Sequence, residues 1–345
     1  MKSNTFGLDI GTTTTKIVWL SKDRSSFRYN SALLTPTPLN SMQSESQFDH
    51  QELAKFLNKA VIEAKIGTNN VNIALPENRV FTKVITMPVL TEKELANAIY
   101  WEAEQYIPAQ LDTMTLDWNV LYKPQTSEPT DKMQVLLVAA PIQLIKRYQS
   151  ILELAGLSVA SIETEILSVL RGVVRDKTFP TSLLIHLGAV NTSLAIVQNG
   201  MLIFNYTIPL GGAAMTRGIA TDFGFTQQQA EEYKNVYGLS DKNFGGKVKS
   251  AINPILTEIL SEVKKSIAFY REKYKNQSPI SQILLTGGTA SLPGIDVYFV
   301  QNFGIETVTA NPWKLHGITN VPEDVQARGS EFVIALGLAL KEYEV

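Results

Sequence analysis

The stretch FGLDIGTTTTKIVWL, residues 6–20, decides the fold, because it contains a strand, a glycine-threonine turn and a second strand. The same pattern returns at residues 183–197, LLIHLGAVNTSLAIV, where Gly188 takes the place of Gly11. This self-similarity indicates an internal duplication. The copies are too far apart for a solenoid, so they predict two related domains with a ligand site in a cleft between them.

A further glycine turn lies in residues 281–295, SQILLTGGTASLPGI, where an apolar strand runs into Gly287-Gly288-Thr289 and then toward a helix. This order is typical of sites that bind phosphate, because glycine lacks the side chain that would keep a ligand away from the backbone. The pair Gly211-Gly212 has the same property. The alternative for both is a plain turn at the start of a helix.

The first turn has the groups that a phosphate chain needs: backbone N–H groups, threonine hydroxyls and one ammonium. Its residues are Gly11, Thr12, Thr13, Thr14 and Lys16. Asp9, on the preceding strand, is suited to a hydrated magnesium ion, which keeps most of its waters and needs a carboxylate nearby. The alternatives are a polar hairpin turn and an aspartate that accepts hydrogen bonds from the backbone.

Residues 80–160 predict a small α+β unit between the two hairpins. Thr91 and Glu94 have the spacing of a capping box, which places the start of a helix at Glu92. The expected apolar stripe of this helix is Leu95, Ile99, Ala103 and Tyr106. Two strands are expected within 71–88 and further strands over 114–122 and 134–140, with a surface loop over 123–132 and a helix over 141–155.

The region that follows the second hairpin is predicted to be a helical lobe. Helices are expected over 213–223 and 226–236, and a long amphipathic helix over 252–270. Residues 330–340, SEFVIALGLAL, are expected to form a compact apolar helix that is buried.

The composition excludes several classes of function. The 345 residues are 44% hydrophobic, so two or three domains with sizeable cores are expected. The net charge is −2 with no long run of either sign, which argues against nucleic acid as a partner. Without cysteine, disulfides and thiolate metal sites are excluded. The start lacks the pattern of a signal peptide, and no run of 18 uncharged apolar residues occurs, so the sequence predicts a cytoplasmic protein.

Several motifs together resemble the actin-like ATPase superfamily. They are Leu8-Asp9-Ile10-Gly11-Thr12-Thr13, the second glycine hairpin, Ala230-Glu231-x-x-Lys234, Thr286-Gly287-Gly288 and Ala335-Leu336-Gly337. The segments WEAEQYIP, 101–108, and IPLGG, 208–212, followed by TQQQAEE, 226–232, resemble the PilM family, with the FtsA family as its nearest relative. The resemblance covers essentially the whole chain. It implies an α/β, actin-like (ribonuclease H-like) two-lobed ATPase fold with an inserted α+β subdomain of the FtsA/PilM type.

The resemblance also implies the domain organisation. The expected ranges are 1–79, 161–180 and 331–345 for the first lobe, 80–160 for the inserted subdomain, 181–206 and 280–330 for the second lobe, and 207–279 for a helical subdomain that contacts the nucleotide.

The cofactors implied are ATP and Mg²⁺, with Asp9 bound to the metal through water. The expected nucleotide-binding residues are Gly11, Thr12, Thr13, Thr14 and Lys16 in the first phosphate loop, Gly188, Asn191 and Thr192 in the second, Gly211 and Gly212 beside them, Glu231 and Lys234 at the ribose, and Gly287, Gly288 and Thr289 at the adenosine. The alternative for Glu231 and Lys234 is an exposed ion pair on a helix.

The resemblance also bears on catalysis. Glu165, with Glu163 as near neighbour, falls where the superfamily places the residue that orients the attacking water. The second phosphate hairpin of the family normally carries an aspartate where this chain has His186. We therefore expect nucleotide binding with slow or absent hydrolysis, and enzymatic activity stays open. A histidine packed in the core is the alternative.

The resemblance implies a scaffold of the type IV pilus, held at the inner face of the cell membrane through its partner. The groove beside the inserted subdomain is expected to bind the N-terminal cytoplasmic peptide of PilN, and the cytoplasmic face to meet the pilus motor ATPase. Self-association stays open. The alternatives are a division scaffold of the FtsA type, disfavoured because the chain stops directly after its last apolar helix, and a small-molecule kinase, for which no substrate-binding segment is evident.

Overall fold

The computed structural model describes residues 4–23, 26–38, 42, 44–124, 131–275 and 278–343. Most of the loop predicted over 123–132 lies outside the described residues, as do Glu344 and Val345 at the end of the chain. In the described part, no helix is both long and apolar enough to cross a bilayer.

The first lobe is built on a five-stranded sheet in the order β3-β2-β1-β4-β8. Its strands are β1 (Thr5–Ile10), β2 (Thr14–Asp23), β3 (Ser26–Pro36), β4 (Asn70–Leu75) and β8 (Ser158–Thr164). The hairpin predicted from residues 6–20 is present: β1 and β2 are antiparallel, with Ile10 opposite Thr15. β4 runs parallel to β1, and β8 runs parallel to β4. The carboxyl ends of these three parallel strands therefore meet at one edge of the sheet.

The second lobe repeats this topology strand for strand, in the order β11-β10-β9-β12-β13. Its strands are β9 (Ser182–Leu187), β10 (Thr192–Gln198), β11 (Met201–Ile208), β12 (Gln282–Thr286) and β13 (Glu306–Thr309). Leu187 lies opposite Thr192, the same register that Ile10 and Thr15 have in the first copy. The internal duplication is thus confirmed at the level of single residue pairs.

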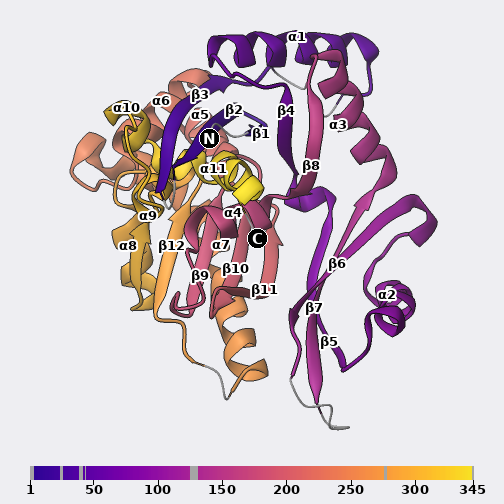
Figure 1. The fold of residues 1–345 in the computed structure, drawn as a ribbon. Coiled ribbons are helices and arrows are strands. Elements are labelled where there is room, and N and C mark those ends of the chain that lie inside the picture. The colour runs from indigo at the N-terminus through magenta and orange to yellow at the C-terminus, as the bar shows by residue number, and fades with distance from the viewer. Residues whose placement is uncertain are drawn as a thin grey trace.

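Helices cover the sheets and fill the space between them (Figure 1). They are α1 (Gln47–Glu63), α2 (Glu92–Tyr106), α3 (Ile142–Leu154), α4 (Glu165–Val173), α5 (Gly212–Phe223), α6 (Gln227–Tyr237), α7 (Lys247–Lys273), α8 (Ile295–Phe303), α9 (Pro312–Leu315), α10 (Glu323–Ala327) and α11 (Val333–Leu340). Short 3-10 turns lie at Glu77–Arg79 (η1), Leu111–Thr113 (η2), Asn243–Gly246 (η3), Gly288–Ser291 (η4), Gly329–Phe332 (η5) and Lys341–Tyr343 (η6).

The apolar helix α11 lies at the centre of the molecule, drawn in yellow in Figure 1. All of its residues are buried, as its uniformly apolar sequence predicts. One side packs on β2 through Val18 and Leu20, while Ile334 joins a cluster with Leu184 of the second lobe. The helix therefore belongs to the cores of both lobes.

The inserted sheet has the order β5-β7-β6, with β5 (Phe81–Pro88), β6 (Met114–Tyr122) and β7 (Lys132–Pro141). Helix α2 begins with the predicted capping box and covers one face of this sheet. Tyr106 was expected in its apolar stripe, but 37% of the residue is exposed and its ring lies beneath the ammonium of Lys83. Ile107, one residue beyond the helix, is buried instead.

Helix α3 and strand β8 pack with the first lobe, although the predicted range 80–160 placed α3 and residues 158–160 of β8 in the inserted unit. Tyr148 of α3 shares a buried cluster with Leu57 of α1, and β8 pairs with β4. These placements favour a shorter inserted unit over 81–141.

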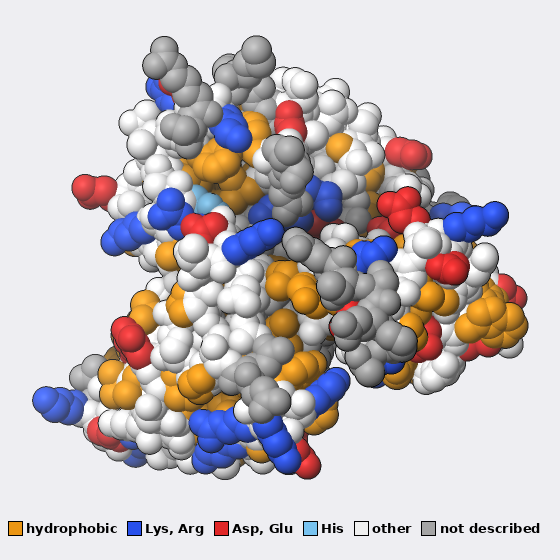
Figure 2. Space-filling model, turned by 60° about the horizontal axis from the view of Figure 1, so that its bottom comes forward, with side chains coloured by type: hydrophobic (Ala, Val, Ile, Leu, Met, Phe, Trp, Pro, Cys, Tyr) orange, Lys and Arg blue, Asp and Glu red, His pale blue; other side chains and the backbone are white. Residues whose placement is uncertain are grey.

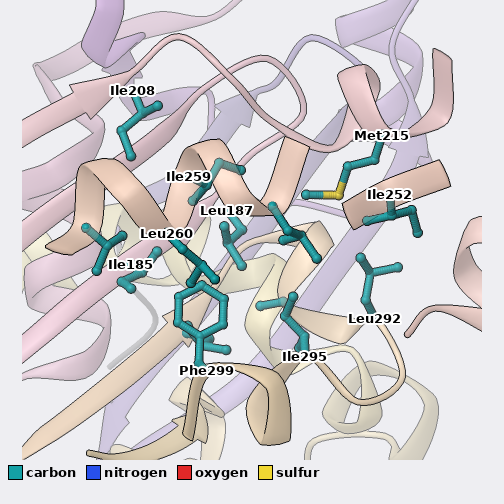
Figure 3. Packing of buried hydrophobic residues seen from close by; sticks show 14 of the residues in the cluster. Ile185, Leu187, Ile208, Met215, Ile252, Ile259, Leu260, Leu292, Ile295 and Phe299 are labelled. Carbon is teal, nitrogen blue, oxygen red and sulfur yellow. The ribbon is translucent and has the colours of Figure 1, made fainter. Parts of the chain in front are cut away.

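The helical part of the second lobe packs on the face of its sheet (Figure 3). Ile185 and Leu187 of β9 meet Ile259 and Leu260 of α7 and Phe299 of α8 in one cluster. The predicted helix over 252–270 lies within the longer α7, and its apolar positions form the buried face. This packing fixes the start of α5 relative to the end of β9.

Candidate functional site

Turns that are far apart in the sequence lie close together at the ends of the central strands of the two lobes. The backbone N–H of Gly212 donates to the carbonyl of Gly188 (2.9 Å), and Ala213 donates to Ala189 (2.8 Å). These bonds join the start of α5 to the turn after β9. The predicted second phosphate loop and the Gly211-Gly212 pair are therefore in contact.

The turn after β1 exposes the residues that the sequence predicts to bind phosphate. Thr12 and Thr13 are exposed at its tip. Thr37, which follows β3, stabilises the turn through two hydrogen bonds. Its hydroxyl donates to the carbonyl of Gly11 (2.8 Å), and its N–H donates to the carbonyl of Thr13 (3.0 Å). No local sequence pattern marks Thr37, because its role depends on the pairing of β3 with β2.

Asp9 and Lys16 lie opposite each other on β1 and β2 and form an ion pair of 3.2 Å. The Asp9 carboxylate is almost fully buried, whereas Lys16 keeps partial contact with solvent. The ion pair compensates for the burial of the carboxylate. It also holds the ammonium next to the turn, where it can meet a phosphate.

Glu165 is the first residue of α4 and lies partly buried near this ion pair. Burial, together with the negative charge of Asp9, raises the pKa of Glu165 to about 8. Glu77 of η1, which belongs to none of the predicted motifs, lies next to it, and burial raises the pKa of Glu77 to about 7. In the sequence, the feature that could have pointed to Glu77 is that it is a carboxylate shortly after the apolar strand 71–75.

Glu163 has a different environment from Glu165. Its carboxylate is bound by Arg171 (2.9 Å to the second oxygen) and by Lys341 (2.6 Å). The Arg171 guanidinium and the Lys341 ammonium lower its pKa despite its burial. Glu163 therefore joins β8 to α4 and to the end of α11.

His186 lies at the end of β9, in the position that corresponds to Asp9. Its Nδ1 is 3.0 Å from the hydroxyl of Thr286 on β12. Burial, together with the positive charge of Lys16, lowers its pKa to about 3. The imidazole is therefore neutral at physiological pH. Lys16 acts on His186 from the other lobe, so the ends of the two hairpins lie near each other.

Lys234 and Glu231 of α6 do not form the exposed ion pair that was the alternative interpretation, because only 4% of Lys234 is exposed. Lys234 donates to Glu231 (2.6 Å), to Thr216 (2.9 Å) and to the carbonyl of Gly212 (3.2 Å). A half-exposed carboxylate is thus held at a fixed position beside the start of α5.

Two glycines in this region leave no room for a side chain. A Cβ on Gly212 would overlap the hydroxyl of Thr289, and one on Gly287 would lie 2.5 Å from the carbonyl oxygen of Leu187. Gly287 also has a φ of +89°, which favours glycine. Its N–H donates to the carbonyl of Ser330, and Gly288 and Thr289 follow in η4. Both glycines are therefore required by close contacts within the protein, which hold the start of α5, η4 and the end of β9 together.

The described residues contain no group of three or more His, Asp or Glu side chains arranged as metal ligands. A single carboxylate such as that of Asp9 is suited to a magnesium ion that keeps its waters.

A separate cavity of about 600 Å³ lies between the inserted sheet, α4 and the turn between β10 and β11. Leu136 and Val138 of β7 form one apolar wall, and Leu167 and Leu170 of α4 form another. Met201 of the second lobe also lines it. The Glu163 cluster and the basic residues Arg175 and Lys177 are also part of its lining. The cavity is thus apolar with charged groups, and the inserted unit and both lobes contribute to it.

Comparisons with known proteins agree with this architecture. The sequence model of the family described as "Type IV pilus assembly protein PilM" matches residues 7–343. The chain is similar to the solved structure titled "PilM-PilN type IV pilus biogenesis complex", with a TM-score of 0.87, 26% identity and coverage of 99% of both chains.

More distant relatives share the fold. MreB 5 of Spiroplasma citri bound to AMPPNP is similar with a TM-score of 0.54 and 15% identity, over 98% of this chain and 96% of that one. The cell division protein FtsA of Streptococcus pneumoniae serotype 2 (strain D39 / NCTC 7466) is 23% identical over 375 residues, which covers 96% of this chain and 79% of FtsA. The fold is therefore that of the actin-like ATPases. Because the family match extends over nearly the whole sequence, the chain belongs to the PilM family of type IV pilus assembly proteins.

Proposed function

We propose that this protein is a nucleotide-binding scaffold of the pilus assembly platform that holds the N-terminal cytoplasmic peptide of a PilN-type membrane protein. The observation that carries the proposal is the cavity beside the inserted sheet, in a chain whose fold matches the PilM-PilN complex along its whole length. The partner would keep the protein at the inner face of the membrane. Its link to the pilus motor ATPase is part of the proposal and rests on family membership.

The cavity is suited to a short apolar segment with polar ends. Leu136, Val138 and Leu170 offer aliphatic contacts to apolar side chains. Asp117 and Asn119 of the edge strand β6 also line it, so an extended peptide could bond to strand backbone while its side chains enter the cavity. The inserted unit and both lobes would then be connected through the bound peptide.

ATP is the proposed ligand of the converging turns. The N–H groups and hydroxyls of the exposed residues Thr12 and Thr13 and the ammonium of Lys16 would bind phosphate oxygens, with the turn from Gly188 to Asn191 on the other side. Glu231 would accept hydrogen bonds from the ribose hydroxyls. The turn Gly287-Gly288-Thr289 would lie against the adenosine.

Magnesium bound with ATP would neutralise part of the phosphate charge. Asp9 would hold it through water on the side of the first lobe. His186 is neutral and cannot replace a second aspartate there. We therefore expect the protein to bind ATP and to hydrolyse it slowly or not at all.

The proposed role of the cavity in peptide binding can be tested by calorimetric titration of the purified protein with a synthetic peptide that has the sequence of the PilN N-terminus from the same organism. Met201→Glu adds a carboxylate to the cavity wall and should weaken binding at least about tenfold, the effect of about 1.4 kcal/mol. The matched control Val236→Glu places the same charge on an exposed site of α6 and should bind like wild type. Equal affinities for both variants would place the peptide elsewhere.

A further inference from the structure

Glu77 lies at a junction that the nucleotide-binding motifs do not include. It follows β4 after a single proline, and β5, the first strand of the inserted unit, begins at Phe81. β4 pairs with β8 so that Leu75 lies opposite Thr164. The residues that follow these two strands, Glu77 and Glu165, therefore lie side by side at the edge of the sheet that carries the nucleotide-binding turns.

The two glutamates are joined by a reciprocal pair of hydrogen bonds. The backbone N–H of Glu77 donates to the carboxylate of Glu165 (3.1 Å). In return, the N–H of Ile166 donates to the carboxylate of Glu77 (3.2 Å). Thr164, the residue before α4, forms no side-chain cap, so Glu77 satisfies an amide in the first turn of that helix. We refer to these two bonds as the Glu77–Glu165 clasp.

The clasp connects two regions of different function. On one side, Glu165 is within electrostatic reach of Asp9, Lys16 and the hydroxyl of Tyr148. On the other side, the carboxyl of Glu77 is near the hydroxyls of Thr82, on β5, and Thr164. Only 5% of Glu77 is exposed, so the carboxyl group cannot exchange its protein partners for bulk water without local opening.

We infer that Glu77 is a positioning residue: it holds Glu165 toward the phosphate end of the nucleotide site and ties that position to the first strand of the inserted unit. The inference rests on the proposed nucleotide site. Phosphate groups beside Lys16 bring negative charge close to the carboxyl groups of Asp9 and Glu165. Because Glu165 is bonded to the backbone of Glu77, any displacement of its side chain is transmitted to residues 77–88.

Amide hydrogen exchange of the whole protein, followed by mass spectrometry with and without Mg-ATP, tests the inference. In wild type, nucleotide should change the exchange rate of amides in 77–88 by at least about fivefold, the lower end of ordinary coupling. Glu77→Ala keeps the backbone N–H that binds Glu165 but removes the acceptor for Ile166, so the first turn of α4, which carries Glu165, is no longer held to residue 77 by this second bond. It should therefore abolish the response, while ATP affinity stays within about threefold, less than about 1 kcal/mol. Glu77→Gln keeps an acceptor oxygen and the backbone donor, so it should retain the response.

Glu165→Ala breaks the other bond of the clasp and provides a second test if Glu77→Ala fails to fold, which the thermal midpoint would reveal. It should also abolish the response in 77–88. A response like wild type in either alanine variant, or its loss in Glu77→Gln, overturns the inference. Wild-type protein that binds ATP without a response in 77–88 contradicts the inference alone. Wild type that does not bind ATP contradicts the proposed nucleotide site and the inference with it.

Discussion

At the residue scale, the proposed nucleotide site depends both on glycine positions that have no room for a side chain and on groups that form hydrogen bonds. At Gly287, a positive φ coincides with crowding, since a Cβ there would lie only 2.5 Å from the carbonyl oxygen of Leu187. Gly304, at the end of α8, has a positive φ of +63° but no atom within 4 Å of its Cβ position. A comparison of the two glycines therefore separates the effect of a positive φ from the effect of a steric clash at the Cβ position.

Gly287→Ala should lower the free energy of unfolding by about 2–4 kcal/mol and abolish ATP binding, because it adds a steric clash to a strained φ. Gly304→Ala has the strain alone and should cost about 1 kcal/mol with unchanged ATP affinity. Chemical denaturation and nucleotide titration measure both quantities. Comparable losses of ATP affinity in both variants would refute the role assigned to Gly287.

The raised pKa of Glu165 predicts that the stability of the protein depends on pH. Its pKa is about 8 in the folded protein against an ordinary value of 4.5, so the folded state binds the proton more tightly. The contribution of Glu165 to stability is therefore complete at low pH and is lost as the pH rises from about 4.5 to 8.

Glu165→Gln has no titrating group, so its stability relative to wild type should rise between about pH 5 and pH 8, by on the order of 1–3 kcal/mol. Denaturant unfolding of both proteins at several pH values measures this difference. A difference that stays constant over this range would show that Glu165 titrates normally.

At the element scale, the starts of α2 and α6 could be predicted from the sequence, whereas α7 begins at Lys247, before its predicted start at residue 252. Thr91 and Thr226 both form complete capping boxes. The first of these helices begins at its predicted residue and the second within one residue of it, since a cap is read from a local pattern. The strand pairing of β8 and the packing of α3 were missed, because neither depends on residues that are close in sequence.

The two capping boxes also provide a matched pair of variants. Thr226→Ala and Thr91→Ala should each cost about 1 kcal/mol of stability. Only α6 carries Glu231 and Lys234, so Thr226→Ala should weaken ATP binding up to about fivefold, whereas Thr91→Ala should leave it unchanged. Circular dichroism and nucleotide titration would show both effects. A loss of ATP affinity in Thr91→Ala would contradict the assignment of α6 to the nucleotide site.

The site itself could be predicted in part. The glycine and threonine turns and the pair formed by Glu231 and Lys234 were visible because they belong to continuous motifs. Thr37, Thr216 and Glu77 were not, because each one acts on a turn or helix from a different part of the chain.

The inserted unit exposes large aromatic side chains, which include Trp101 of α2 and Trp118 of β6. In Figure 2, hydrophobic side chains lie among charged ones at the right of the view.

At the scale of the whole molecule, the duplicated lobes share one buried helix, α11, and the inserted unit lies against both of them. Val84 of β5 and Leu136 of β7 pack into the same cluster as Leu202 of β11. A change in the angle between the lobes would therefore alter the cavity beside the inserted sheet. This arrangement gives a physical route by which ATP could change the affinity for a peptide.

The most direct measurement is a calorimetric titration of the wild-type protein with the N-terminal cytoplasmic peptide of its cognate PilN, in the absence and presence of Mg-ATP. We predict saturable binding with one peptide per chain and an affinity that changes at least about fivefold when nucleotide is added. Absence of peptide binding in both states would contradict the proposed scaffold function and favour a role like that of the FtsA relatives. Binding that is identical in both states would contradict the coupling between the two sites.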